Sequence, residues 1–205
     1  MHKAVLLDLG KTVIDFDLGR AYRKLAPFCP LSGAEIARRV AASGLAGRFV
    51  TGRIDGLELF RGLRERLLLE LEFQPFVEIW NCIFTETLIP EEALEGLASR
   101  YPLVLVSNTN ALHFEWLRRE KPFLRHFSHL ILSHEAGAAK PDPAIFRLAI
   151  ERAGCLPGEC FYTDDIPPFV EAARDLGMDA TQFTGWDGLR NDFARRGIGW
   201  RKPSR

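Results

Sequence analysis

The feature that constrains the fold most is the run Ala4-Val5-Leu6-Leu7, which is short, entirely apolar and followed directly by Asp8. A continuous apolar run of this length is typical of a strand that is buried on both faces of a parallel sheet. Similar runs recur and alternate with segments of helical spacing, so we predict an α/β fold with a Rossmann-like, doubly wound parallel sheet. Later strands are expected at 103–106, 129–133, 159–162 and 179–183.

The segment that follows the first strand carries apolar residues at helical spacing. Helices are expected at 19–28, 33–42, 57–71 and 73–84, with a turn-rich passage at 44–56. Ser32 and Glu35 form a capping box before the second helix. Phe76, Trp80 and Phe84 are expected to pack inside this block. We therefore predict that residues 17–86 form an all-helical cap without strands, inserted into a core made of residues 1–16 and 87–205.

Charge and cysteine content exclude several classes of partner. The chain has 27 basic and 27 acidic residues, so no net charge favours nucleic acid or an anionic membrane surface. No apolar run approaches the roughly 18 residues that span a membrane. The four cysteines form no CxxC pair, which is typical of reduced thiols in a cytoplasmic protein. The sequence is compatible with both a monomer and a homodimer.

Polar side chains follow three of the predicted strands, and a lysine lies in a proline-rich loop before a predicted helix. Because the carboxyl ends of parallel strands meet at one edge of a sheet, we expect these side chains to lie close together. The residues are Asp8, Ser107, Asn108, Lys140, Asp164 and Asp165.

The residue types in this group indicate phosphoryl transfer. Carboxylates that share a site raise each other's pKa, and a divalent cation removes the conflict. A donor set made only of oxygen atoms suits Mg²⁺. The hydroxyl, amide and ammonium groups suit phosphate oxygens. We therefore expect chemistry that runs through an aspartyl-phosphate.

In their order along the chain, these segments resemble the four motifs of the haloacid dehalogenase-like hydrolase superfamily. The segments are residues 6–13, 105–110, 140–146 and 161–165. The opening Asp8-Leu9-Gly10 also resembles the bacterial glucose-1-phosphate phosphatase branch and, more remotely, the phosphatase domain of mammalian epoxide hydrolases. The resemblance implies a helical cap after the first motif and Mg²⁺-dependent hydrolysis of a small phosphorylated metabolite, with a sugar phosphate favoured.

The resemblance also implies roles for individual residues around the metal. Asp8 is the implied nucleophile and a metal ligand. The main-chain carbonyl of Gly10 and the carboxylate of Asp165 are the implied second and third ligands. Asp164 is expected to hold a metal-bound water or to orient the site.

A second set of implied roles concerns the phosphate. Ser107 and Lys140 are the implied phosphate-binding residues, and the amide of Asn108 contributes a further donor. Lys140 is also expected to restrain the charge of Asp8 during catalysis.

The chain departs from the superfamily at Gly10, where most of its phosphatases carry a second Asp that protonates the leaving oxygen. Lost acid–base catalysis typically costs ~100- to 10,000-fold in rate. The glucose-1-phosphate branch shares the glycine, and Lys11, Asp15, Asp17 or a water are candidate substitutes. Two alternatives follow. One is a weakened member that binds phosphate or a protein partner, and the other is a metal-free haloacid dehalogenase, against which the paired acids at 164 and 165 argue.

Overall fold

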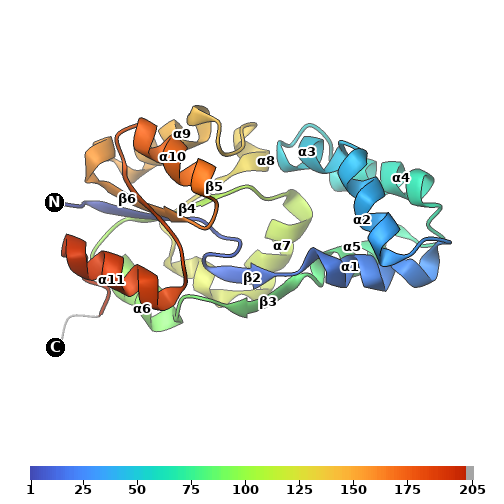
Figure 1. The fold of residues 1–205 in the computed structure, drawn as a ribbon, viewed down its shortest axis with the longest axis horizontal. Coiled ribbons are helices and arrows are strands. Elements are labelled where there is room, and N and C mark those ends of the chain that lie inside the picture. Colours follow the sequence, from blue (N-terminus) through green and yellow to red (C-terminus); the bar gives the residue numbers. More distant parts are fainter. Residues whose placement is uncertain (202–205) are drawn as a thin grey trace.

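Residues 1–201 are described in a computed structural model of the protein (Figure 1). Five parallel strands form the central sheet in the order β5-β4-β1-β6-β7, so the first strand of the chain lies in the middle. The predicted α/β, Rossmann-like architecture is therefore confirmed. The strands are β1 (Ala4–Leu7), β4 (Leu103–Ser107), β5 (His129–Leu132), β6 (Cys160–Asp164) and β7 (Asp179–Gln182).

Helices cover both faces of the sheet, which explains why β1 is apolar at every position. Val5 and Leu7 belong to one hydrophobic core, whereas Ala4 and Leu6 belong to the core on the opposite face. In Figure 1, α9 and α10 lie above the sheet and α6 and α11 below it. These helices, with α7, are α6 (Glu91–Ala98), α7 (Ala111–Glu120), α9 (Pro143–Ala153), α10 (Pro167–Asp175) and α11 (Trp186–Arg196).

Five helices that follow the first strand pack around a third core, in which Leu63 and Phe76 are fully buried. Ser32 starts α2 with the expected capping box, and a second capping box starts α4 at Asp55. Helix α3 lies in the passage predicted to be turn-rich. Its six residues span fewer than two helical turns, which is too short to show a helical period in the sequence. We call this group the helical insert: α1 (Leu18–Leu25), α2 (Gly33–Ala42), α3 (Leu45–Val50), α4 (Gly56–Leu67) and α5 (Phe73–Asn81).

The prediction that residues 17–86 contain no strand is wrong. Strand β2 (Ile14–Phe16) pairs antiparallel with β3 (Phe84–Thr87), and Phe16 lies opposite Phe84. The two segments connect the insert to the sheet in opposite directions, so they run side by side and satisfy each other's backbone groups (Figure 1). Helix α5 accordingly ends at Asn81, before the predicted residue 84.

The helical insert touches the sheet domain at α8 (Ser133–Ala136). The Ser133 hydroxyl lies 2.6 Å from the main-chain carbonyl oxygen of Val50 in α3. Gly52 has a φ of +68°, and a Cβ there would lie 2.1 Å from the carbonyl oxygen of His134. Only glycine allows this approach, so the insert is held close to the carboxyl end of β5. Short 3₁₀ turns occur at η1 (Ala26–Phe28), η2 (Pro122–His126) and η3 (Pro157–Glu159).

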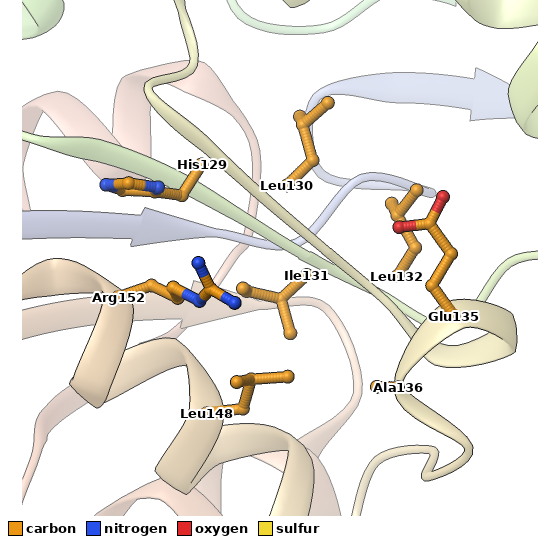
Figure 2. Close-up of a pocket in the computed structure, with 8 residues that line it drawn as sticks. All are labelled: His129, Leu130, Ile131, Leu132, Glu135, Ala136, Leu148 and Arg152. Carbon is orange, nitrogen blue, oxygen red and sulfur yellow. The ribbon is translucent and has the colours of Figure 1, made fainter.

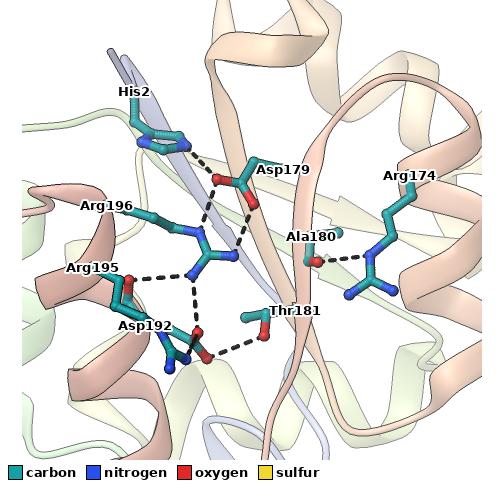
Figure 3. Close-up of polar contacts among 8 residues, drawn as sticks. All are labelled: His2, Arg174, Asp179, Ala180, Thr181, Asp192, Arg195 and Arg196. Carbon is teal, nitrogen blue, oxygen red and sulfur yellow. Dashed lines mark hydrogen bonds and ion pairs between the residues drawn. The ribbon is translucent and has the colours of Figure 1, made fainter.

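The amino ends of the strands carry a network of ion pairs (Figure 3). Arg196 donates to both carboxylate oxygens of Asp179, at 2.8 and 3.0 Å, and to Asp192 at 2.9 Å. The ring of His2 lies 2.9 Å from Asp179. This network joins α11 to the start of β7 and to the residues before β1. Within residues 1–201, no helix is long and apolar enough to cross a membrane.

Candidate active site

The carboxyl ends of β1, β4 and β6 bring the predicted residues to one edge of the sheet. Asp8 follows β1 directly and is 6% exposed, with its main-chain N–H bonded to the carbonyl of Thr163. Ser107 is the last residue of β4 and is 2% exposed. Asp164 is the last residue of β6 and is fully buried. Parallel pairing of β1 with both neighbours therefore explains the convergence.

Lys140 lies between two carboxylates. Its Nζ is 2.5 Å from Oδ1 of Asp8 and 2.6 Å from Oδ2 of Asp164. The hydroxyl of Tyr162 also bonds to Asp164, and the Ile166 main-chain N–H donates to the other oxygen of that carboxylate at 2.9 Å. The Asp164 carboxylate is thus held by three donors, whereas Asp165 is only partly buried.

Burial dominates the electrostatics of this group. Desolvation raises the pKa of Asp8 to about 7, with Asp164 adding to the rise and Lys140 opposing it. Burial lowers the pKa of the Lys140 ammonium, but the two carboxylates outweigh burial and leave that pKa above its ordinary value. Desolvation and the neighbouring Asp164 raise the pKa of Asp165. Each carboxyl whose pKa is raised would be stabilised in its charged form by a nearby cation.

The donor set fits a divalent cation. Carboxylate oxygens of Asp8, Asp164 and Asp165 all lie within 4.8 Å of one another. Three carboxylates against the single ammonium of Lys140 leave a surplus of two negative charges. Oxygen donors and a surplus of this size are what Mg²⁺ requires. Gly10, whose carbonyl was the predicted further ligand, lies in the turn after β1 and forms an isolated bridge with Ile14.

Asn108 bonds to the main chain of Lys140. Its Nδ2 donates to the carbonyl of Lys140 at 2.9 Å, and its Oδ1 accepts from the Lys140 main-chain N–H at 2.7 Å. These two bonds align the lysine loop with the end of β4. The amide carries a second N–H, so its contact with phosphate stays a prediction.

The turn after Gly10 is filled by an aromatic ring. A Cβ at Gly10 would lie 2.7 Å from Cε1 of Phe16, so a side chain at this position would collide with the ring. Lys11 has a φ of +61°, and its ammonium is 2.5 Å from Asp15 and 5.2 Å from the Phe16 ring centroid. The unusual lysine is therefore paired with one of the acids considered as a substitute.

A cavity of about 250 Å³ lies between the helical insert and this edge of the sheet. Sequence reasoning assigned its aromatic lining to the core or to structural roles, because the residues fit a helical period and become neighbours only when the insert docks. The lining residues are Leu9, Gly10, Phe16, Leu18, Tyr22, Val40, Ala46, Val50, Trp80, Ile83, Phe84, Ser107, Asn108, Thr109, Asn110 and His113.

His113 is a buried member of this lining. Its Nδ1 lies 2.9 Å from Oδ1 of Asn81, which has no proton to give, so Nδ1 carries the proton. Burial lowers the pKa of His113 to about 3, and the imidazole is therefore neutral at pH 7. The ring stacks on Trp80 with 5.9 Å between centroids.

A second groove, along the edge strand β5, shares no residue with the carboxylate group (Figure 2). It has a volume of about 290 Å³ and is lined by apolar side chains such as Ile131 and Leu148. Arg152 and Glu135 lie toward its two ends in Figure 2. His129 lies on the same side of the groove as Arg152, apart from Glu135.

Comparison with known proteins identifies the family of this chain. Residues 2–177 match the family described as haloacid dehalogenase-like hydrolase. The chain is 25% identical over 192 residues to D-ribitol-5-phosphate phosphatase of Bacteroides thetaiotaomicron, covering 89% of this chain and 92% of that protein. It is 34% identical over 204 residues to phosphoserine phosphatase of Thermus thermophilus, covering 88% of this chain and 80% of that one.

The fold also resembles that of a solved HAD family enzyme. A HAD family enzyme from Bacteroides thetaiotaomicron, in complex with magnesium and inorganic phosphate, superposes with a TM-score of 0.81 at 26% identity. The match covers 92% of this chain and 99% of the other. The family expected from the motifs is confirmed: the chain belongs to the haloacid dehalogenase-like hydrolases.

Proposed function

We propose that this protein is a Mg²⁺-dependent phosphatase that hydrolyses a small phosphorylated metabolite through an aspartyl-phosphate on Asp8. The observation that carries the proposal is the carboxylate group, in which oxygens of Asp8, Asp164 and Asp165 lie within 4.8 Å while Lys140 bonds to two of them. Likeness to two enzymes named phosphatases, and to a structure that contains magnesium and phosphate, supports it.

Asp8 is the proposed nucleophile because it directly follows the central strand and precedes two residues that line the cavity, Leu9 and Gly10. The ammonium of Lys140 lies 2.5 Å from the Asp8 carboxylate and holds it in place. Its positive charge also lowers the free-energy cost of ionising Asp8 in a buried site. The hydroxyl of Ser107 is the proposed donor to a phosphate oxygen, since Ser107 lines the same cavity.

The proposed metal ligands are Asp8, the carbonyl of Gly10 and Asp165, with Asp164 orienting the group through its bonds to Lys140 and Ile166. Bound Mg²⁺ would supply positive charge that offsets the charge of the phosphoryl group. We assign Asn108 to positioning Lys140, because both its amide atoms bond to the lysine main chain.

We propose that residues 17–86 act as a cap over a core made of residues 1–16 and 87–205. The helices of this segment have their own hydrophobic core, and the segment contacts the sheet domain through Val50 and Gly52. A cap of this kind shields the reacting group from water and lines the space for the leaving group.

A sugar phosphate is one candidate substrate, and the likeness to D-ribitol-5-phosphate phosphatase supports it. The likeness to phosphoserine phosphatase points to a different leaving group. The names of the two relatives share the phosphoryl group and differ in the molecule that carries it, so the class proposed for this chain is a small phosphorylated metabolite.

One observation favours a second candidate, a weakened member that binds phosphate or a protein partner without efficient turnover. The Phe16 ring covers Gly10, where a carboxylic acid would otherwise project. A metal-free dehalogenase has less support, because a surplus of two negative charges around Lys140 calls for a cation.

Hydrolysis of p-nitrophenyl phosphate with and without Mg²⁺ separates these functions. We expect turnover that requires Mg²⁺ and is lost in Asp8→Asn. Phosphate binding without turnover would favour the weakened member. Metal-independent release of halide from a haloacid would favour the dehalogenase.

A further inference from the structure

The cavity beside the candidate active site limits what the phosphate can be attached to. Its lining includes Gly10 and Ser107 on the sheet side and Val50 and Trp80 on the insert side. Because Ser107 is the proposed phosphate ligand, the group esterified to that phosphate extends into this space. The chemistry of the lining therefore indicates the chemistry of the leaving group.

The lining is apolar and aromatic. None of its residues, all within the described part of the chain, is Asp, Glu, Lys or Arg. The Trp80 ring stacks on His113 at an interplanar angle of 4°, and Phe84 meets the same imidazole edge-on at 85°. The rings already pack on one another, and with the apolar side chains around them they form a wall that suits an apolar or aromatic ligand. An apolar cavity of about 150 Å³ holds a benzene ring, so one of 250 Å³ has room for it.

Three polar side chains of the lining already bond to the protein. Both amide atoms of Asn108 bond to Lys140, Oδ1 of Asn110 accepts from the main-chain N–H of His113 at 3.0 Å, and Nδ1 of His113 bonds to Asn81. Within residues 1–201, the indole N–H of Trp80 has no hydrogen-bond partner, although this residue is only 6% exposed. A polyol hydroxyl that faces the apolar part of the wall finds no partner there, and each unpaired hydroxyl weakens binding by roughly fivefold to a hundredfold.

The cavity also lacks a proton donor for a departing alkoxide. Among its described residues, the side chains that titrate are Tyr22 and His113. His113 is neutral, and its one ring N–H is directed to Asn81. Burial raises the pKa of Tyr22, which makes its hydroxyl a poorer acid. The ring of Phe16 fills the space beside Gly10. The leaving oxygen must therefore depart without a proton from this lining.

We propose that the substrate is the phosphate monoester of an aromatic alcohol, whose ring occupies the apolar cavity and leaves as a phenolate. The inference rests on the proposed function and names the substrate class of the same site. A carboxylate oxygen of Asp8 forms a bond to phosphorus while the bond from phosphorus to the phenolic oxygen breaks, its electron pair staying on that oxygen. A phenol has a pKa of about 10, against about 16 for water, so a phenolate is a stable leaving group without a proton. Solvent later protonates the phenolate, and water cleaves the aspartyl-phosphate to release inorganic phosphate.

Two esters of primary alcohols isolate the effect of the cavity from the effect of the leaving group. We expect kcat/KM for 2-phenylethyl phosphate to exceed that for D-ribitol 5-phosphate by about tenfold or more, since the polyol leaves several hydroxyls unpaired. Both leaving oxygens belong to primary alcohols of similar acidity. Equal values, or a preference for the polyol, would overturn the inference.

A series of substituted phenyl phosphates tests the missing proton donor. Without an acid, the rate of phosphoryl transfer falls as the phenol becomes less acidic. We expect kcat/KM to decrease by about tenfold or more across a series that spans several pKa units. A flat series, with the absence of a burst showing that transfer is rate-limiting, would reveal an acid in the site and contradict the phenolate step.

A pair of matched variants tests the cavity itself. Val50→Thr places a hydroxyl in the lining, and Val77→Thr makes the same change in α5 outside it. We expect the first to lower kcat/KM for phenyl phosphate by about threefold to tenfold and the second to leave it unchanged. Equal effects would show that the ring does not occupy this cavity.

Failure of this inference is distinguishable from failure of the proposed function. Hydrolysis that depends on Asp8 and Mg²⁺ but favours the polyol ester overturns the substrate class alone. Absence of hydrolysis for every ester in the panel, in folded protein with Mg²⁺, overturns the proposed function as well.

Discussion

The sheet carries two clusters in which a cation bonds to a pair of carboxylates, and they lie at opposite ends of its strands. The lysine cluster, at the carboxyl ends, consists of Asp8, Lys140 and Asp164. The arginine cluster, at the amino ends, consists of Asp179, Arg196 and Asp192, and Asp192 also pairs with Arg195 at 2.6 Å (Figure 3). Their burial differs: the Lys140 side chain is 1% exposed and that of Arg196 is 22% exposed.

The difference in burial separates a functional cluster from a structural one. In the arginine cluster, a planar guanidinium bonds to both oxygens of Asp179, and these bonds lower the pKa of that carboxyl. In the lysine cluster, desolvation outweighs the ammonium and raises the pKa of Asp8 to about 7. In the arginine cluster two guanidinium groups balance two carboxylates, whereas the lysine cluster, with Asp165 beside it, retains negative charge that a bound cation would neutralise.

The largest expected effect is on turnover. Asp8→Asn should lower kcat by roughly 10⁴-fold or more, because removing a nucleophile leaves only residual rate enhancement from binding. Asp179→Asn makes the same change in the arginine cluster and should leave kcat within about twofold. Steady-state hydrolysis of p-nitrophenyl phosphate with Mg²⁺ measures both. Retention of full activity by the Asp8 variant would break the comparison.

Stability should respond unequally to loss of the two cations. Lys140→Met leaves two buried carboxylates without a partner and should lower the free energy of unfolding by about 3–5 kcal/mol. Arg196→Met affects groups that solvent reaches, so a loss of about 1 kcal/mol is expected. Urea denaturation in EDTA gives both values. Equal losses would mean that burial does not distinguish the clusters.

Metal binding should stabilise the fold through the lysine cluster only. At a Mg²⁺ concentration near 100 times its Kd, the free energy of unfolding should rise by about 2.7 kcal/mol. Asp165→Asn removes one proposed ligand and should abolish most of that gain at the same concentration. Asp192→Asn, in the arginine cluster, should keep it. A gain that survives Asp165→Asn would remove this carboxylate from the metal site.

A further expected effect is a difference in pH dependence. The folded-state pKa of Asp8 is raised, so its contribution to stability is present below about pH 4 and is lost as the pH rises through about 7. The pKa of Asp179 is lowered, so its contribution is present above about pH 4 and is lost at lower pH. Metal-free protein should therefore lose up to ~1.4 kcal/mol per pH unit from Asp8 between about pH 4 and 7.

Substituting each aspartate in turn separates the contributions of Asp8 and Asp179 to the pH dependence of stability. In urea denaturation with EDTA, Asp8→Asn should remove the loss of stability on the alkaline side, and Asp179→Asn should alter only the acid side. If neither substitution changes the pH dependence of stability, the pKa of Asp8 is not raised in the folded protein.

Sequence alone predicts the sheet and the position of the polar group, because both follow from local pattern. The apolar run before Asp8 fixes a buried strand, and parallel strands carry the residues after them to one edge. The ribbon of β2 and β3 was missed, since Phe84 also fits the helical spacing of the preceding segment. Antiparallel pairing across a separation of this size depends on the fold and leaves no local signal.

The cavity could not be predicted, because its walls come from distant segments. Trp80 and His113 have the spacing of core residues, and they become a shared wall only where the helical insert meets α7. The sequence shows that position 10 is a glycine, but it does not show that the Phe16 ring packs over this glycine. The chemistry of the site is thus encoded in motifs, whereas its selectivity is encoded in packing.

Trapping the phosphoryl group tests the central claim most directly. The protein is mixed with p-nitrophenyl phosphate and Mg²⁺, quenched in acid within one turnover, and examined by intact mass and peptide mapping. We predict one added phosphoryl group on Asp8, absent in Asp8→Asn and absent when EDTA replaces Mg²⁺. Rapid product release with an unmodified Asp8, or a phosphoryl group carried by another residue, would contradict the account.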